Sequence, residues 1–364
     1  MKVMHVEAGK NLYGGALQVF YLLRELAGEG IENILVCPTG SAIAEQAQDC
    51  AVVEACTMRG DLDLGFVGRL SALIDRHQPD LVHVHSRRGA DLWSLFAAKR
   101  KSVPAILTRR VDNPEPGWFA RKKYHGYNKV VAISEGIRQV LLSEGVAVDH
   151  VRTIHSAVDS DKFSPGRQRN LLSKRFDVPE DALVVAVVAQ LIERKGHRYL
   201  FEIVPRLLET FPSLRIVVLG KGGMESQLKQ DVAQRGLTEN IIFAGFHPDI
   251  ENILPHVDIV AHPALMEGLG VALLQASACA VPIVGAAAGG IPEIVRHEHN
   301  GLLVPPADSE ALYEALATLL ADADLRALYG KNGRALVESD FSIAQMAKRN
   351  AALYREVLTE AAKV

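Results

Sequence analysis

The chain has 364 residues, of which 48% are hydrophobic, and its formal net charge is -3. This length suggests two domains of ordinary size, each large enough for its own core. No run of 18 apolar residues free of charge occurs, so we expect a globular protein without a transmembrane helix.

Short apolar runs alternate with helical patterns, which is typical of parallel sheets covered by helices on both faces. The predicted strands of the first half are residues 2–8, 32–38, 52–58, 81–85, 105–109, 129–134 and 151–154, and its helices include 16–28, 65–77, 90–101 and 135–144. A second series of strands follows at 183–190, 214–219, 241–244, 258–264, 283–287 and 302–305. The polar residues 159–177 form the predicted linker. The end of the chain is predicted to be helical, at 309–320, 323–337 and 343 to about 361.

The stretch 259–295 carries the clearest sign of a binding site. It reads as a strand, a turn that holds one carboxylate, Glu267, between small residues, and a helix from about Val271. A second strand and the turn Gly289-Gly290 complete it. The first amides of a helix have no acceptor within the helix and point along its positive end, so they can bind an anion such as a phosphate.

This stretch resembles the signature of the retaining GT-B glycosyltransferases of group 1, family 4. That signature is a Glu, then Gly-aromatic-Gly, then a second Glu eight positions after the first; here it reads Glu267, Gly268, Leu269, Gly270, Val271 and, at the eighth position, Gln275. The resemblance implies that Glu267 contacts the donor sugar, that the following amides hold the diphosphate and that residue 275 binds the ribose. Because an amide lacks the charge of a carboxylate, we expect Gln275 to give a weaker or altered grip on the nucleotide.

Further turns resemble the same family in the same order along the chain. Where the family supplies an Arg and a Lys to neutralise the diphosphate, this sequence has Gln190 and Lys195, with Arg194 as an extra cation. Such preplaced positive groups can stabilise a leaving diphosphate without a metal ion. The implied donor-binding residues outside the signature are Gly15, Gln190, Arg194, Lys195, Gly220 and Phe246.

Two histidines, His83 and His85, lie on the same face of one predicted strand. His85 stands at the carboxyl end, and the resemblance implies that it contacts the donor sugar or the acceptor; it is therefore the second candidate catalytic residue beside Glu267. His83, one pleat deeper, is interpreted as a hydrogen-bonded core residue. The two could form a metal pair, but no third ligand with suitable spacing is evident nearby, so no metal site is predicted.

Residues 87–123 contain ten basic and three acidic side chains, a local net charge of +7, interleaved with aromatic residues. The segment could contact anionic lipid headgroups or a phosphorylated acceptor, or it could be a solvated helix face. Nucleic acid is not expected as a partner, because no recognition motif accompanies the charge. The four cysteines lack CxxC spacing and lie in or beside apolar runs. We therefore expect reduced thiols in a cytoplasmic protein, with peripheral contact at the inner face of the membrane.

The sequence therefore predicts an α/β protein of GT-B fold with two Rossmann-like domains and an interdomain cleft. The predicted domains are residues 1–165 together with 343–361, for the acceptor, and 178–340, for the nucleotide sugar. The last helix would cross back, so that 346–358 pack on the first domain. The implied reaction is metal-independent, retaining transfer from a nucleotide-diphosphate sugar, with a UDP-sugar as first choice and no other cofactor, to a bacterial glycan or glycolipid. A nucleotide-sugar 2-epimerase and a non-catalytic nucleotide-sugar-binding subunit stay open as alternatives, the latter because of Gln190 and Gln275.

Overall fold

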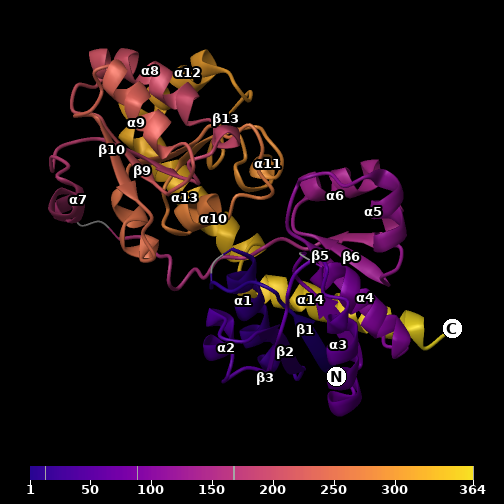
Figure 1. The fold of residues 1–364 in the computed structure, drawn as a ribbon. Coiled ribbons are helices and arrows are strands. Elements are labelled where there is room, and N and C mark those ends of the chain that lie inside the picture. Colours follow the sequence, from indigo (N-terminus) through magenta and orange to yellow (C-terminus); the bar gives the residue numbers. More distant parts are fainter. Residues whose placement is uncertain (13, 88, 167–168, 364) are drawn as a thin grey trace. The chain divides into compact units, whose positions relative to one another are not determined.

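The chain divides into two compact units, each built around its own parallel sheet (Figure 1). The computed structural model describes residues 1–12, 14–87, 89–166 and 169–363. The first unit is Met1–Ala157 with the chain from Ile343 onward, and the second is Val158–Ser342. Residues 158–165, which the sequence analysis assigned to the first domain, belong to the second unit. Tyr13, and Arg88 of the basic segment, lie outside the described residues.

In the described part of the first unit, seven parallel strands are arranged in the order β3-β2-β1-β4-β5-β6-β7. The strands are β1 (Lys2–Val6), β2 (Glu32–Pro38), β3 (Val52–Cys56), β4 (Leu81–Val84), β5 (Ala105–Arg109), β6 (Lys129–Ala132) and β7 (Val151–Thr153). The helices are α1 (Gly15–Gly28), α2 (Ala42–Gln46), α3 (Gly65–His77), α4 (Ala90–Arg100), α5 (Gly117–Tyr124), α6 (Glu135–Ser143) and the C-terminal α14 (Ile343–Ala361).

The sheet of the second unit has six described strands in the order β10-β9-β8-β11-β12-β13, again all parallel. They are β8 (Val184–Val188), β9 (Arg215–Leu219), β10 (Ile241–Gly245), β11 (Ile259–His262), β12 (Ile283–Ala286) and β13 (Gly301–Val304). The helices are α7 (Arg169–Phe176), α8 (His197–Thr210), α9 (Glu225–Gln234), α10 (Val271–Ala278), α11 (Ile291–Ile294), α12 (Ser309–Ala321) and α13 (Ala323–Asp340).

All predicted strands are present, because runs of buried Val, Ile and Leu between turn residues are a strong strand signal. The predicted linker is partly wrong, since its polar residues include the helix α7. A polar segment can still form a helix when one apolar residue anchors it, and Leu172 of α7 is buried. None of the described helices has the length and the apolar character needed to cross a bilayer.

The C-terminal helix α14 completes the core of the first unit. Its residues Met346, Ala351 and Tyr354 share one hydrophobic cluster with Tyr21 and Leu26 of α1. The prediction that 346–358 pack on the first domain is thus confirmed. The two places where the chain passes between the units also lie side by side, since Val158 pairs with Ser342 and its amide donates to Phe341 O at 3.1 Å.

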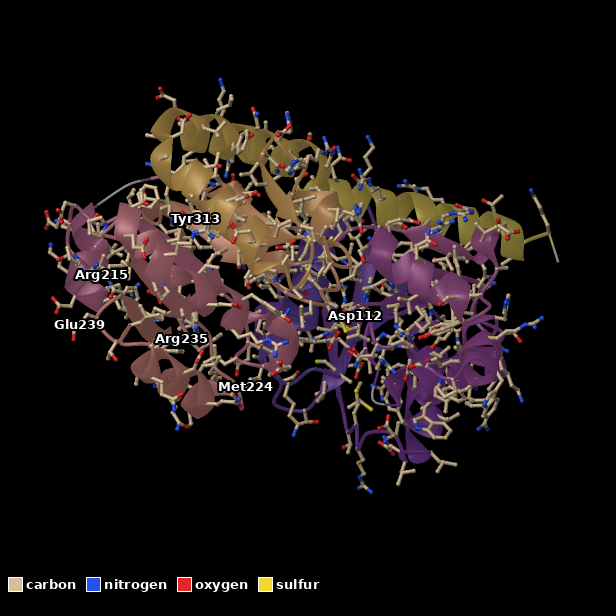
Figure 2. The ribbon with its side chains drawn as sticks, turned by 90° about the horizontal axis from the view of Figure 1, so that it is seen from above. Asp112, Arg215, Met224, Arg235, Glu239 and Tyr313 are labelled. Atoms are coloured by element: carbon tan, nitrogen blue, oxygen red, sulfur yellow. The ribbon has the colours of Figure 1, made fainter. Side chains whose placement is uncertain are left out.

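In the second unit a hydrophobic cluster lies between the sheet and the helices α8, α9 and α12. Tyr313, on α12 and labelled in Figure 2, is half-buried and packs against this cluster. The guanidinium of Arg206, on α8, lies 3.6 Å from the centroid of the Tyr313 ring. On the other side, α13 packs against α10, the helix predicted to bind the anion.

We predict that Gly330→Ala destabilises the second unit, although alanine normally favours a helix. A Cβ at Gly330 would lie 2.0 Å from the backbone oxygen of Ala280, just after α10. Because a backbone atom cannot rotate away, we expect a loss of about 1–3 kcal/mol in the free energy of unfolding, measured with urea. Gly333→Ala is the matched control on the same helix, since its Cβ would lie 3.4 Å from the nearest atom, in Ser277. Equal losses in both variants would contradict the prediction.

Candidate functional site

The second unit gathers its candidate residues where the strand order reverses, between β8 and β11. In open α/β sheets the loops after these two strands part to opposite faces and leave a crevice at the carboxyl edge. The loop after β8 carries Lys195, in a short 3-10 turn at Glu193–Lys195, and the loop after β11 carries Glu267. The topology therefore brings together two residues that are 72 positions apart.

Lys195 and Glu267 form an ion pair, with His262 as a third member. Lys195 Nζ lies 2.5 Å from Glu267 Oε2, and His262 Nε2 lies 2.8 Å from the same oxygen. Because a carboxylate only accepts hydrogen bonds, His262 Nε2 carries its hydrogen. The other oxygen, Glu267 Oε1, accepts a bond of 3.2 Å from the amide of Gly268. This weaker bond leaves Oε1 able to accept a hydrogen bond from a ligand hydroxyl.

The environment of Glu267 keeps its carboxylate ionised. Burial raises its pKa, but the hydrogen bond and charge of His262 and the charge of Lys195 outweigh burial and lower the pKa to about 2. Only 15% of the Glu267 side chain and 9% of the Lys195 side chain are exposed. A carboxylate in this state is a weak base and a poor proton donor, but a good hydrogen-bond acceptor.

Two glycines hold these loops in backbone contact. A Cβ at Gly196 would lie 1.9 Å from Pro263 O, and one at Gly289 would lie 1.8 Å from Glu267 O. The amides of the neighbouring residues reinforce the contact, since Gly290 N donates to Glu267 O at 3.1 Å and Leu265 N donates to Arg194 O at 2.8 Å. No residue with a side chain fits at either position without moving the backbone.

The other predicted donor-binding residues of this unit lie around the same sheet edge. Gly268, Leu269 and Gly270 lead into α10, whose N-cap is Gly270 and whose first residue is Val271. Gln275 is half-buried within α10, and Arg194 is half-buried beside Lys195. Gln190 is exposed after β8, Gly220 follows β9, and Phe246 follows β10 with Lys221 Nζ 5.1 Å from its ring centroid.

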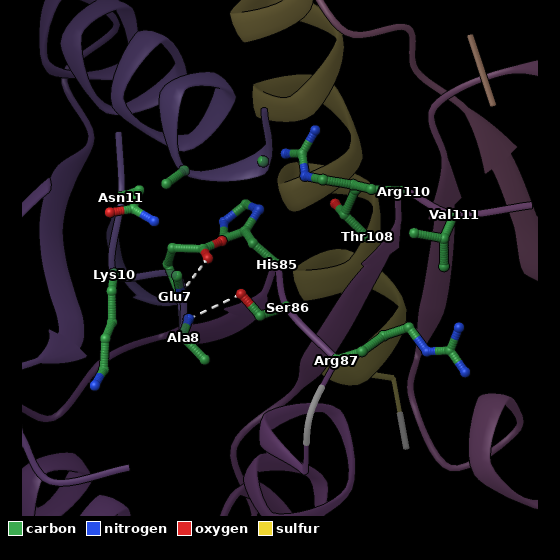
Figure 3. Close-up of a pocket in the computed structure, with 13 residues that line it drawn as sticks. Glu7, Ala8, Lys10, Asn11, His85, Ser86, Arg87, Thr108, Arg110 and Val111 are labelled. Atoms are coloured by element: carbon green, nitrogen blue, oxygen red, sulfur yellow. Dashed lines mark hydrogen bonds between the residues drawn. The ribbon is translucent and has the colours of Figure 1, made fainter. Parts of the chain in front are cut away.

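In the first unit the strand order reverses between β1 and β4. A cavity of about 400 Å³ lies beside these two strands (Figure 3). Glu7, His85 and Arg110 border it, each from the end of a different strand. Glu7 is buried, and its Oε1 accepts from the Gly9 amide at 2.7 Å. Within the described residues, Glu7 Oε2 and His85 Nδ1 are buried without a hydrogen-bond partner. Gly15, the predicted donor-binding residue of this unit, also borders the cavity.

Three buried histidines, not two, cluster beside this cavity. His5 on β1 is the third: its Nδ1 lies 3.0 Å from His85 Nε2, and the two rings are stacked with 9° between their planes. Burial is the main cause that lowers the pKa of all three, to about 3 for His5, so they are neutral near pH 7. The expectation that the pair lacks a third neighbour was therefore wrong, because the register of β1 against β4 pairs His5 with His83.

A metal ion would have to break existing bonds in this cluster. One nitrogen from each ring lies within 4.8 Å of the others, the one such group found among the described His, Cys, Asp and Glu residues. However, His83 already bonds Tyr354 OH through Nδ1 and Thr108 Oγ1 through Nε2, both at 2.7 Å. His83 is thus the hydrogen-bonded core histidine that the sequence indicated.

The predicted catalytic pair is divided between the units, with Glu267 in the second and His85 in the first. Each has its place within its own unit, and a donor sugar in contact with both stays a prediction. Sequence reasoning missed His262, Glu7 and His5. The signal in the sequence was their position. Each of the three lies in, or directly follows, one of the two strands between which the strand order of its sheet reverses.

Two family models match the chain. The model described as "Glycosyl transferases group 1" matches residues 168–336, which include Lys195 and Glu267. The model described as "Glycosyltransferase Family 4" matches residues 13–162, which include His85.

Curated proteins of this kind are similar over most of the chain. A GDP-mannose-dependent alpha-(1-6)-phosphatidylinositol monomannoside mannosyltransferase of Mycolicibacterium smegmatis is 32% identical over 73% of this chain and 74% of its own. The lipopolysaccharide core biosynthesis glycosyltransferase LpsE of Rhizobium meliloti is 26% identical over 94% and 95%. The chain spans about half, 53%, of a related GDP-mannose-dependent mannosyltransferase of Corynebacterium glutamicum, with 33% identity.

Solved structures share the two-unit fold. A glycosyltransferase from Rickettsia africae superposes with a TM-score of 0.87 at 21% identity, over 98% of each chain. The Anabaena protein HepE in complex with UDP gives a TM-score of 0.83 at 20% identity, over 98% of this chain and all of that one.

We predict a stability contribution from Glu267 that depends on pH. Its folded-state pKa is depressed from 4.5 to about 2, so the contribution is complete above about pH 4.5 and is lost as the pH falls towards 2. A shift of this size corresponds to roughly 3 kcal/mol. The difference in the free energy of unfolding between wild type and Glu267→Gln should be constant from neutral pH to about pH 5 and should shrink below it.

The control for this measurement is Glu298→Gln, because the Glu298 side chain is 75% exposed. Its difference from wild type should stay small at every pH. A difference for Glu267→Gln that does not change with pH would show that Glu267 titrates alike in the folded and unfolded chains.

Proposed function

Because this chain belongs to the group 1 glycosyltransferases, of GT-B fold, we propose that it transfers a sugar from a nucleotide-diphosphate sugar to a glycan or lipid-linked acceptor. We propose further that the anomeric configuration is retained and that no metal ion takes part. The observation that carries this proposal is the cluster of Lys195, Glu267 and His262 at the strand reversal of the second unit, within the segment that matches the family model.

In the proposed reaction the diphosphate lies at the start of α10, where the first amides of the helix and Lys195 Nζ balance its charge. Lys195 Nζ is held 2.5 Å from Glu267 Oε2 by their ion pair. Its ammonium group is therefore already placed, and its long side chain loses little further freedom on binding. This placement supports departure of the diphosphate without a metal ion.

Glu267 would orient the sugar rather than exchange a proton. Its pKa of about 2 leaves it ionised, and Oε1 can accept from a sugar hydroxyl. A negative charge next to the reacting carbon would also stabilise a transition state with positive character. We assign it neither as a nucleophile nor as a general base.

The cavity of the first unit is proposed to bind hydroxyl groups of the sugar or the acceptor. Glu7 Oε2 and His85 Nδ1 are buried polar atoms on its border that lack partners in the described chain. A hydroxyl donates one hydrogen bond and accepts others, so it can satisfy a carboxylate and an imidazole together. His85 is neutral, because burial lowers its pKa, and it therefore suits contact with an uncharged hydroxyl.

A UDP-sugar is our first choice of donor, since the Anabaena protein is in complex with UDP, while the mannosyltransferases of Mycolicibacterium and Corynebacterium are GDP-mannose-dependent. For the acceptor we propose a bacterial surface glycan or its lipid-linked precursor, by analogy with LpsE of Rhizobium. We also propose a cytoplasmic location, with which the four free cysteines agree. Gln275 would bond the ribose without charge.

The first test is thermal unfolding of the protein with UDP, GDP, ADP, NAD and the corresponding nucleotide sugars, each with and without EDTA. A ligand at 100 times its Kd stabilises the folded state by about 2.7 kcal/mol, which raises Tm by several degrees. We expect one diphosphonucleotide class to raise Tm equally with EDTA. A shift with NAD alone would contradict the proposal, and a shift without transfer to any acceptor would favour the non-catalytic alternative.

We predict that loss of Lys195 mainly affects nucleotide binding, whereas loss of the Glu267 charge mainly affects kcat. Lys195→Met should weaken nucleotide binding by about 10- to 100-fold, because a charged hydrogen bond to the diphosphate is lost. Glu267→Gln should retain nucleotide binding, since Lys195 loses a competitor, but should lower kcat by about 100-fold or more. Titration calorimetry and initial rates measure both quantities.

The control for the pair is Lys229→Met. Lys229 forms a surface ion pair with Glu225 at 2.7 Å and is 51% exposed, so its loss should change neither binding nor rate. Transfer at the wild-type rate by Glu267→Gln would refute the role proposed for that residue.

A further inference from the structure

The basic segment 87–123 separates into residues with internal partners and residues without them. Its ten cations include Arg88, outside the described residues, and Arg110, which borders the cavity. Four others form ion pairs within the first unit. These are Arg87 with Glu115, Lys101 with Asp75, Arg109 with Glu115 and Glu144, and Lys123 with Asp91 and Glu115.

The ion pairs of Arg109 and Lys123 are structural. Only 1% of the Arg109 side chain and 3% of the Lys123 side chain are exposed, and Lys123 Nζ lies 2.7 Å from Asp91 Oδ2 and 2.8 Å from Glu115 Oε2. Lys123 therefore ties α5 to α4, which carries Asp91. These charges are compensated inside the protein, so they are not available to an external partner.

The remaining four cations lie on the outer side of the same two helices. Lys99 and Arg100 end α4, Arg121 and Lys122 lie on α5, and all four are exposed. Within the described chain, none of them is ion-paired to a carboxylate. We call them, together with Trp118 and Phe96, the α4–α5 surface.

Two aromatic rings project from this surface. Trp118 is 76% exposed and Phe96 is 50% exposed. Trp118 borders a hollow of about 460 Å³ together with Lys99, Arg121 and Lys122. The exposed ring of Trp118 contacts water instead of other side chains, so its apolar surface contributes little to the stability of the fold.

We propose that the α4–α5 surface docks on a bilayer that contains anionic phospholipid. Tryptophan favours the boundary between headgroups and acyl chains, because its ring is apolar and its N–H is polar. Each cation near an anionic membrane adds attraction. Stable anchoring needs two contributions together, which here are the tryptophan and the cations. A nucleic acid fits less well, since four cations give only weak backbone binding at physiological salt.

This proposal does not depend on the transferase activity. None of its residues borders the cavity of the first unit or belongs to the cluster around Lys195 and Glu267. Vesicle binding can therefore be measured without donor or acceptor, and nucleotide binding can be measured without lipid. If one of the two proposals fails, the other is unaffected.

The test is co-sedimentation of the whole protein with vesicles of phosphatidylcholine alone or with one third phosphatidylglycerol. We expect binding only to the anionic vesicles, and weaker binding as salt is raised. Arg121→Gln with Lys122→Gln should weaken it about 30-fold, since each cation contributes about fivefold. The matched control, Lys331→Gln with Lys348→Gln, changes the net charge equally at exposed positions elsewhere and should bind like wild type.

A second readout reports on Trp118 directly. The chain has two tryptophans, so Trp93→Phe leaves Trp118 as the single tryptophan, which can be excited selectively over tyrosine. Its emission should shift to the blue on anionic vesicles and should be quenched by brominated acyl chains. Equal binding by the α4–α5 double variant and the control variant would overturn the proposal. So would an unchanged Trp118 spectrum, or binding to single-stranded RNA without binding to vesicles.

Discussion

The reversal of strand order in each sheet is the constraint on which both candidate sites depend. In the first unit the chain adds strands on one side of β1 and then on the other, beginning with β4, and in the second unit β8 and β11 stand in the same relation. The loops after these strands part to opposite faces, so the carboxyl edge between them stays open. Glu7 and His85 follow the reversal strands of one sheet, and Lys195 and Glu267 follow those of the other. The same topology thus produces two sites from unrelated side chains.

The two sites differ in their electrostatics. In the second unit the ammonium group of Lys195 and the imidazole of His262 contact the same carboxylate oxygen of Glu267, so the charge of Glu267 is compensated within the protein. In the first unit burial keeps three histidines neutral. The ammonium group of Lys195 suits a ligand with a diphosphate. In the first unit, the neutral His85 beside the Glu7 carboxylate suits hydroxyl groups, as the proposed transfer requires. In the second unit the geometry rests on close backbone contacts, where Gly196 and Gly289 leave no room for a Cβ.

Local patterns predicted the elements well and the contacts between them poorly. Ser134 caps α6, and its Oγ accepts from Ile137 N at 3.0 Å; a contact of this kind follows from local sequence because it joins neighbours in the chain. The bond from His262 to Glu267 spans five residues but depends on the path of the loop after β11, which no periodicity reveals. His5 joins His83 and His85 only through the register of β1 against β4. The net charge of residues 87–123 overstates the charge open to a partner for the same reason, since Glu144, outside the segment, and Asp91, on another helix, neutralise Arg109 and Lys123.

The position of α14 gives the units an order of assembly during synthesis. The second unit is one continuous stretch of chain, whereas the first unit needs residues from both before and after it. Until Met346 and Tyr354 have left the ribosome, the apolar face of α1 that includes Leu26 lacks its cover. The unit that is made first is therefore finished last. Its seven described strands all lie before residue 154, but α14, which covers α1, is synthesised only after the whole second unit. A chain stalled before residue 346 would expose that face, which makes the α1 surface the expected target for a chaperone on the nascent protein.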